Sequence, residues 1–258
     1  MPEQTEIRFL LTDVDDTLTT DGKLLPETLA ALVRLQNQGI RTIAVTGACA
    51  GWCDQMIRLW PLDAVIGENG AFVFYRDEAG RVRTDFYADR EQMAQQQREL
   101  RQRTESYLTT EPTLVLAHDQ AFRYCDVAVD FAPSPQSPAS PLVVQAFMDT
   151  LQREGYQTLR SSIHINCWSG EHNKRRMTER FLMQQYGLSA TDMLVQCAFI
   201  GDAPNDEPMF AWLPATYGVA NIRPYIDVLT TPPATILDRR GGLGFVDLVD
   251  HLLQPLHG

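Results

Sequence analysis

The chain lacks the long apolar runs of a membrane-spanning protein. No stretch of its 258 residues approaches the roughly 20 consecutive apolar residues that cross a bilayer as a helix. Residues 1–6 are acidic and polar, whereas a secretory signal begins with positive charge and continues with an apolar stretch. We therefore expect a cytoplasmic protein with no membrane partner.

Basic residues are scarce relative to acidic ones. The chain has 22 Lys and Arg against 33 Asp and Glu, which gives a formal net charge of −11 at pH 7. Nucleic acids are usually bound by Lys and Arg surfaces that displace counterions, so we expect no nucleic-acid partner. An acidic chain can still contain a cationic site, because a bound divalent metal ion reverses the local charge.

The cysteines show neither zinc-site spacing nor a disulfide framework. They are five in number and scattered, and the one close pair, Cys49 and Cys53, has no second pair at zinc-finger spacing. We expect structural thiols in a reducing compartment. With 44% hydrophobic residues, the chain can form one large α/β domain or a core with an insertion.

The N-terminal part alternates between short apolar strands and helices. Three apolar segments are typical of strands buried on both faces of a parallel sheet: 7–11, 41–45 and 64–67. We expect a helix that begins at Pro26 and is stopped by Gly39, with the apolar Leu29, Leu32 and Val33 on one face, and another over 54–60. This strand–helix–strand order is typical of a doubly wound sheet.

The alternation breaks after the third strand. Two strand-like segments, 71–75 and 81–87, flank residues 77–80 (DEAG) as in a hairpin. The next segments predict a helix over 90–108, a strand over 122–131, a loop containing Pro133, Pro135, Pro138 and Pro141, a helix over 142–153 and one or two strands within 158–168. We interpret 84–167 as an inserted α+β cap domain between core segments 1–83 and 168–258.

The alternating pattern then returns. We expect a helix over 172–186 with Met177, Phe181 and Leu182 buried, followed by a strand over 197–200, a helix over 207–212, a strand over 216–219 and a helix over 245–253. The predicted fold class is therefore α/β, with a doubly wound Rossmann-like parallel-sheet core and an inserted α+β cap.

Chemically useful side chains follow several core strands. They are Asp13, Asp15, Thr46, Asp202 and Asp206. The ligand site of an open α/β sheet lies outside the carboxyl ends of its strands, so we expect these side chains to converge. Clustered carboxylates are tolerable when a divalent cation and an ammonium neutralise them. Lys174 can supply that ammonium.

This set suits hydrolysis of a phosphate monoester, which needs up to about 10²¹-fold acceleration. Asp13 would attack phosphorus and form an aspartyl-phosphate, and Asp15 would protonate the leaving oxygen and then deprotonate the hydrolytic water. Thr46 and Lys174 would hold the phosphoryl oxygens, and Mg²⁺ would bridge the nucleophile and the phosphoryl group. We expect Asp16 to be a turn residue only.

The same segments resemble the motifs of phosphatases of the haloacid dehalogenase superfamily. The matching segments are 13–18 (DVDDTL, for D-x-D-x-T), 45–47 (VTG), 172–174 (HNK) and 201–206 (GDAPND, for G-D-x-x-N-D). Residues 68–71 (ENGA) and 218–221 (GVAN) are similar to segments common in the IIB, or Cof-type, subgroup with a C2 cap. The resemblance covers nearly the whole chain.

The resemblance implies roles for individual residues. Mg²⁺ would be held by Asp13, by the backbone carbonyl of Asp15 and by Asp202. The phosphate would be bound by Thr46, Gly47 and Lys174, while Asn205 and Asp206 would support these groups. The IIB branch includes sugar-phosphate and sugar-acid-phosphate phosphatases, so the expected partner is a small phosphorylated metabolite. Monomer and homodimer both remain open.

Substrate contacts are expected mainly from the cap. Many relatives carry Arg after the Thr-Gly pair, where this chain has Ala48, so any contact made by that arginine is in doubt. His164 and Asn166 alternate with Ile163 and Ile165 and therefore share one sheet face. The candidate substrate-binding residues are Asn69, Arg160, His164 and Asn166.

Two other functions share parts of this pattern. A phosphosugar mutase would use the same aspartyl-phosphate but return the phosphoryl group to its substrate. A non-catalytic receiver-like switch also combines an acidic cluster with Thr and Lys on a doubly wound sheet. Against the switch we set the long insertion and the position of the presumed nucleophile after the first strand rather than a central one.

Overall fold

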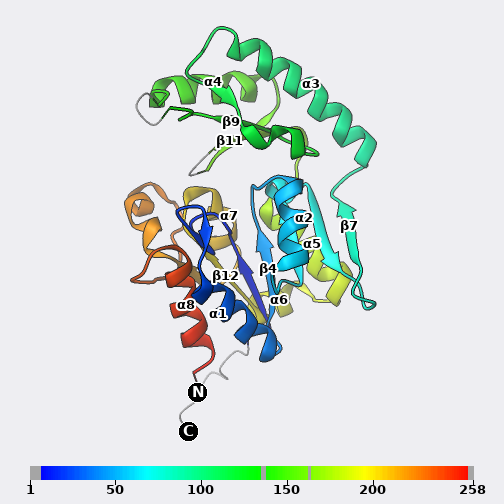
Figure 1. The fold of residues 1–258 in the computed structure, drawn as a ribbon, viewed down its shortest axis with the longest axis vertical. Helices are drawn as coiled ribbons and strands as arrows, with labels where there is room; N and C mark the ends of the chain where they lie inside the picture. Colours follow the sequence, from blue (N-terminus) through cyan, green and yellow to red (C-terminus); the bar gives the residue numbers. More distant parts are fainter. Residues whose placement is uncertain (1–6, 135–137, 162–163, 255–258) are drawn as a thin grey trace.

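A large, mostly parallel sheet forms the centre of the core (Figure 1). The computed structural model describes residues 7–134, 138–161 and 164–254. Among these residues the sheet has eight strands, in the order β14 (Thr235–Ile236), β13 (Ala215–Gly218), β12 (Cys197–Gly201), β1 (Phe9–Thr12), β4 (Arg41–Val45), β5 (Ala64–Gly67), β6 (Phe72–Arg76) and β7 (Val82–Phe86). The strands from β14 to β5 run parallel, whereas β6 and β7 are antiparallel.

Helices cover both faces of this sheet. One face packs against α1 (Pro26–Asn37), α2 (Ala50–Leu59) and α8 (Gly241–Leu252), and the other against α5 (Lys174–Tyr186), α6 (Ala190–Gln196) and α7 (Glu207–Phe210). Leu10 and Leu11 point to opposite faces because successive strand residues alternate. The doubly wound α/β class is confirmed. No helix in the described part of the chain is both long and apolar enough to cross a membrane.

The three apolar residues expected on one face of α1 are not all buried. Leu29 and Val33 are exposed, at 38% and 40%, while Ala31, Leu32 and Leu35 are buried. The helix contacts both β4 and α8, and these two neighbours, rather than the apolar residues alone, determine which side is covered. In α5, by contrast, the prediction that Met177, Phe181 and Leu182 are buried is confirmed.

The cap has its own sheet and its own core. The four strands of its sheet, as described, are β10 (Gln157–Arg160), β11 (His164–Trp168), β9 (Val127–Asp130) and β8 (Val115–Leu116), all antiparallel. One face packs on α3 (Arg90–Leu108) and α4 (Pro141–Arg153). In Figure 1 the cap lies above the core, with both helices on the far side of the cap sheet.

The cap strand expected over 122–131 is shorter than predicted. Only 127–130 pairs in the sheet, and 118–122 form a short 3-10 helix, η2 (His118–Phe122). The N–H groups of Tyr124, Cys125 and Asp126 donate to the carboxylate of Glu68 instead of to a neighbouring strand. A core side chain therefore keeps this segment out of the sheet.

Other boundaries shift by a few residues. The helix α6 was not predicted, although Ser189 and Asp192 form a capping box at its start. β7 runs to Phe86 in the core sheet, and β11 ends at Trp168 in the cap sheet. The division at 83 and 167 stays a prediction. Pro135 and Ile163 lie outside the described residues.

The five cysteines are buried and unpaired.

Small elements lie at the carboxyl edge of the core sheet. The hairpin of β2 (Thr19–Thr20) and β3 (Lys23–Leu24) follows β1, and η1 (Glu68–Gly70) follows β5. η3 (Pro204–Asp206) follows β12, and η4 (Ala220–Val228) follows β13. The residues that we expected to carry chemistry lie in or beside these elements.

Gly70 is required for close packing between η1 and the start of α5. Its φ is +103°, and an added Cβ would lie 2.3 Å from the carbonyl oxygen of Asn173, whereas Gly80, at φ +72°, has open space. We expect Gly80→Ala to cost about 1 kcal/mol through backbone strain. Gly70→Ala should cost about 1–3 kcal/mol more through overpacking. Urea unfolding measures both, and equal losses would contradict the packing argument.

Candidate active site

Three adjacent parallel strands bring the predicted residues to one edge. β12, β1 and β4 are neighbours, and Thr12 is in register with Ile200 and Ala44. The backbone N–H of Asp13 donates to the carbonyl of Ile200 at 2.9 Å, which continues the ladder one residue past β1. Asp13, Thr46 and Asp202 therefore follow neighbouring strand ends and meet at the carboxyl edge.

Lys174 connects two of the carboxylates. Its Nζ lies 2.6 Å from Oδ1 of Asp13 and 2.7 Å from Oδ1 of Asp206, and all three side chains are buried. Burial by itself lowers the pKa of Lys174, but the two carboxylates outweigh it and leave the pKa raised. The ammonium is therefore charged. Asn173 positions it by capping α5, since its Oδ1 accepts the N–H of Arg176.

The acidic cluster has the chemistry of a divalent-cation site. Carboxylate oxygens of Asp13, Asp202 and Asp206 lie within 4.8 Å of one another. Burial and the neighbouring carboxylates raise the pKa of Asp13 to about 8 and that of Asp202 to about 9. These raised pKa values mean that the protein groups around the cluster do not fully stabilise its negative charge. Hard cations such as Mg²⁺ prefer oxygen donors of this kind.

The two oxygens of Asp206 are already engaged. Oδ1 accepts from Lys174, and Oδ2 accepts the backbone N–H of Asp202 at 3.1 Å. The carboxylate of Asp202 has, among the described residues, only a long contact of 3.5 Å with the hydroxyl of Thr17. Gly201 gives Asp206 the room it needs, because a Cβ there would lie 2.3 Å from Oδ2. This arrangement suits a supporting role for Asp206 and a ligand role for Asp202.

Asp15 and Asp16 have different surroundings. Asp15 lines the cavity described below, and burial raises its pKa above the usual value of an aspartic acid. Asp16 has a φ of +58°, and its Oδ1 accepts the N–H of Asp21. Its carbonyl accepts from the amide of Asn221, in the 218–221 segment. Asp16 thus makes the contacts expected of a turn residue.

Thr46 and Gly47 follow β4 directly. Thr46 is fully buried, and its Oγ1 accepts the N–H of Ala48 at 3.0 Å. Gly47 and Asn205 line the cavity, whereas Thr46 and Lys174 lie behind its surface. The structure therefore brings every predicted core residue to the same edge, some exposed to the cavity and some beneath it.

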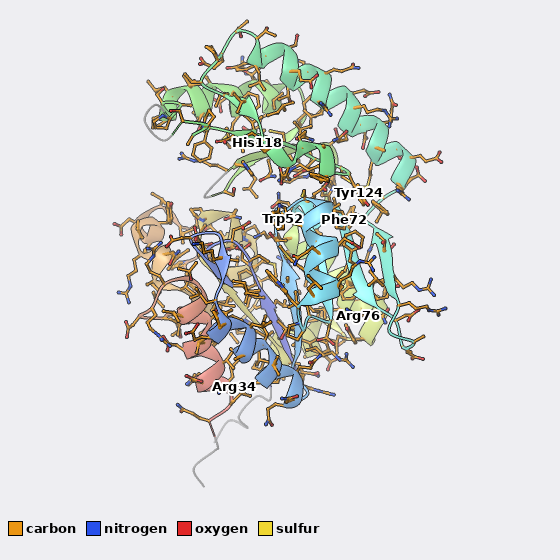
Figure 2. The ribbon with its side chains drawn as sticks, in the orientation of Figure 1. Arg34, Trp52, Phe72, Arg76, His118 and Tyr124 are labelled. Atoms are coloured by element: carbon orange, nitrogen blue, oxygen red, sulfur yellow. The ribbon has the colours of Figure 1, made fainter. Side chains whose placement is uncertain are left out.

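A cavity of about 480 Å³ lies between the core and the cap. The core contributes Asp13, Asp15, Asp202 and side chains of α2 such as Trp52, and the cap contributes residues of η2, β9 and β11. Figure 2 shows Trp52 at the cap end of α2 and His118 on the part of the cap that faces it. This cavity can hold a small metabolite.

The four candidate substrate residues take different places. His164 and Asn166 line the cavity, on the cap face opposite α3 and α4. Asn69 is buried close to Gly47, and its Nδ2 has no hydrogen-bond partner in the described part of the chain. Arg160 does not reach the lining in the described structure, because its guanidinium lies over the ring of Phe131, 4.7 Å from the centroid.

Sequence reasoning missed the contact that joins the core to the cap. Glu68 is fully buried at φ +45°, and its carboxylate accepts four backbone N–H groups. One comes from Ala50 at the start of α2, and the others come from Tyr124, Cys125 and Asp126 of the cap. Burial raises the pKa of Glu68 to about 8, while Arg123 and these N–H groups oppose the shift.

Arg123 makes a second connection. This cap residue donates from Nη1 to the carbonyl of Gly47 at 3.1 Å and to both oxygens of Asp126 at 2.9 Å. Its Nε and Nη2 donate to Asp119. Asn166 also donates to Asp126. An arginine therefore lies beside the 45–47 segment although position 48 is alanine. The resemblance of segment 68–71 to the IIB subgroup was the one sequence feature that pointed to this region.

These observations define a doubly wound α/β core with a buried acidic site under a cap. Residues 10–137 match the family model of haloacid dehalogenase-like hydrolases. The chain belongs to this family. A comparison with curated protein sequences found no match.

Solved structures share the fold over nearly the whole chain. A Thermoplasma acidophilum protein, 0175, is 18% identical, with 95% of this chain and 98% of that one covered and a TM-score of 0.71. The sucrose-phosphatase of Synechocystis sp. PCC6803, solved with sucrose and phosphate, is 17% identical over 96% and 98%, with a TM-score of 0.66. The phosphatase BT1666 of Bacteroides thetaiotaomicron is 19% identical over 98% and 97%, with a TM-score of 0.64.

Replacing Glu68 tests the joint between core and cap. In Glu68→Gln one acceptor oxygen becomes an NH₂ group that faces backbone donors, so we expect a loss of about 1–3 kcal/mol in the free energy of unfolding. Hydrogen exchange at the amides of Tyr124, Cys125 and Asp126 should accelerate. The control is Glu78→Gln at an exposed site. Unchanged exchange at these three amides would contradict the contact.

Replacing Lys174 tests the charge balance of the cluster. Lys174→Met leaves buried carboxylates without their cation, which should cost about 3–5 kcal/mol at pH 8. An acid whose pKa is higher in the folded than in the unfolded chain loses folded-state stability as pH rises between those values. The pKa of Asp13 is already about 8, so the loss should be smaller at pH 5.

Urea unfolding in metal-free buffer measures both values. The matched control is Lys23→Met, at an exposed position, which should change stability little at either pH. An equal loss at pH 5 and pH 8 for Lys174→Met would show that charge compensation is not the function of this residue.

Proposed function

We propose that this chain is a Mg²⁺-dependent phosphomonoester hydrolase that uses an aspartyl-phosphate on Asp13. The observation that carries the proposal is the position of Asp13: its carboxylate is held by Lys174 and borders the cavity beside Asp15. Carboxylate nucleophiles divide a difficult displacement into two easier ones.

In the first step an oxygen of Asp13 attacks phosphorus, and the bond between phosphorus and the leaving oxygen breaks. Asp15 gives its proton to that oxygen, a role that its raised pKa favours. Thr46, Gly47 and Lys174 stabilise the charge on the phosphoryl oxygens. The leaving group departs as a neutral alcohol into the cavity.

In the second step Asp15, now ionised, takes a proton from water, and the water oxygen attacks phosphorus. The bond between Asp13 and phosphorus breaks, and inorganic phosphate leaves. Asp13, Asp202 and the backbone carbonyl of Asp15 would hold Mg²⁺, with Asn205 and Asp206 supporting them. The ion, when bound, neutralises charge on the nucleophile and the phosphoryl oxygens.

The substrate that we propose is a small phosphorylated metabolite, with a sugar as the leaving group. The volume of the cavity suits such a molecule, and the sucrose-phosphatase with a similar fold was solved with sucrose and phosphate. In this proposal His164 and Asn166 contact the leaving group.

The strand that precedes Asp13 is central in the sheet. β1, the first strand in the chain, lies between β12 and β4, so its position does not separate a hydrolase from a receiver-like switch. The cap and the cavity beneath it do favour catalysis, because they provide a site for a leaving group that a phosphorylation switch does not need.

Hydrolysis of p-nitrophenyl phosphate tests the proposal. Activity should require added Mg²⁺ and disappear with EDTA. Asp13→Asn should lower kcat by at least about a thousandfold, as expected when a nucleophile is removed. The matched control is Asp16→Asn, because Asp16 makes turn contacts and asparagine accepts positive φ.

Retained turnover in Asp13→Asn would overturn the mechanism. Circular dichroism shows whether that variant is folded, so loss of activity is separated from loss of structure. Steady release of inorganic phosphate without a bisphosphate activator would exclude the mutase.

A further inference from the structure

The cavity wall that surrounds the leaving group carries an excess of negative charge. Two carboxylates of the cap, Asp119 and Asp130, line it along with Arg123. Arg123 is the only Lys or Arg among the described residues that form the lining. The undescribed cap segments, 135–137 and 162–163, contain no Lys or Arg in their sequence.

The charge of Arg123 is already balanced. Its guanidinium is 1% exposed and forms ion pairs with Asp119 and Asp126 at 2.9 Å. Nη1 also donates to the carbonyl of Gly47. Nearly all of its N–H groups thus have partners, and a negatively charged leaving group would have to displace one of them.

The other basic side chains lie elsewhere. Lys23 and Lys174 are the only lysines of the sequence; Lys23 is exposed, and Lys174 is buried between Asp13 and Asp206. Arg34 and Arg76 lie on the core away from the cap (Figure 2). Arg123 is therefore the one Lys or Arg of the described cavity lining, and Asp119 and Asp126 already pair with it.

Asp130 lies opposite a histidine, His164 on the neighbouring strand β11, rather than opposite a lysine or an arginine. Burial lowers the pKa of His164. Oδ1 of Asp130 accepts the N–H of Ala132 at 2.7 Å. Apart from Asp119, Arg123 and Asp130 of the cap and Asp13, Asp15 and Asp202 at the core edge, the described lining contains no Asp, Glu, Lys or Arg. It includes Trp52 and Trp60, whose rings suit the apolar face of a sugar.

We propose that Asp119 and Asp130 select against negatively charged leaving groups, so that the natural leaving group is a neutral sugar or an amino sugar. This proposal rests on the proposed function and narrows its substrate class. Sugar acids, bisphosphates and nucleotides are disfavoured, because a second negative charge would meet carboxylates in a partly dehydrated space. A bisphosphate intermediate of a mutase is disfavoured for the same reason.

Matched aryl phosphates test the charge selection independently of sugar shape. We compare 4-(hydroxymethyl)phenyl, 4-(aminomethyl)phenyl and 4-carboxyphenyl phosphate at pH 8, where histidine is uncharged. The kcat/KM of the carboxylate should be at least about tenfold below that of the alcohol, and the amine should equal or exceed the alcohol. Glucose 1-phosphate and glucuronic acid 1-phosphate give the same comparison on a sugar.

Two variants assign the effect to residues. Asp119→Asn and Asp130→Asn should each reduce the discrimination between alcohol and carboxylate by at least about threefold. Asp149→Asn, exposed on α4 and outside the lining, makes the same change in net charge and should leave the discrimination as it is. If Asp119→Asn does not fold because Arg123 loses a partner, Asp130→Asn alone decides the assignment.

The outcomes separate this proposal from the proposed function. If no aryl phosphate is hydrolysed, both fail. If the carboxylate is hydrolysed within about twofold of the alcohol, the charge selection is wrong and the hydrolase stands. If discrimination exists but neither variant reduces it, the assignment to Asp119 and Asp130 is wrong.

Discussion

The ion pairs of Lys174 with Asp13 and Asp206 are the interaction on which the rest of the site depends. The ends of two neighbouring strands, β1 and β12, bring three carboxylates to one buried place, and burying charges is unfavourable unless they are paired. A single ammonium, carried by the first residue of α5, makes the cluster tolerable while one face of Asp13 borders the cavity. In the mechanism that we propose, the ammonium that stabilises the folded cluster also stabilises charge on the transferring phosphoryl group.

The joint between core and cap uses the same principle with different groups. Glu68 accepts four backbone N–H groups, one from the core and three from the cap. Arg123 of the cap donates to the carbonyl of Gly47 in the core. Buried charged groups are stable when hydrogen bonds satisfy them on every side. Because Ala50 begins α2, this joint also takes the place of an N-terminal cap, which Cys49 does not provide.

In the function that we propose, the core and the cap have different roles. The core holds the groups that make and break bonds to phosphorus, and a phosphoryl group offers nearly the same oxygens in every substrate. The cap supplies the charges that face the leaving group, Asp119 and Asp130. The classes of substrate that the core motifs left open, sugar phosphates and sugar-acid phosphates, differ in the charge of that group, and the cap wall favours the uncharged one.

The sequence by itself determined the doubly wound core and the acidic residues at its carboxyl edge, because apolar strands and the side chains that follow them are local features. It also indicated that His164 and Asn166 share a face, since alternation in a strand is local as well. Only the tertiary structure decided the buried face of α1, the short strand β9 and the joint of Glu68 with Arg123. These depend on partners far apart in the chain: Glu68 meets residues 124–126 across 56 to 58 positions, and Arg123 meets Gly47 across 76. No local pattern encodes such a contact, because its energy comes from burying opposite charges and hydrogen-bond donors together.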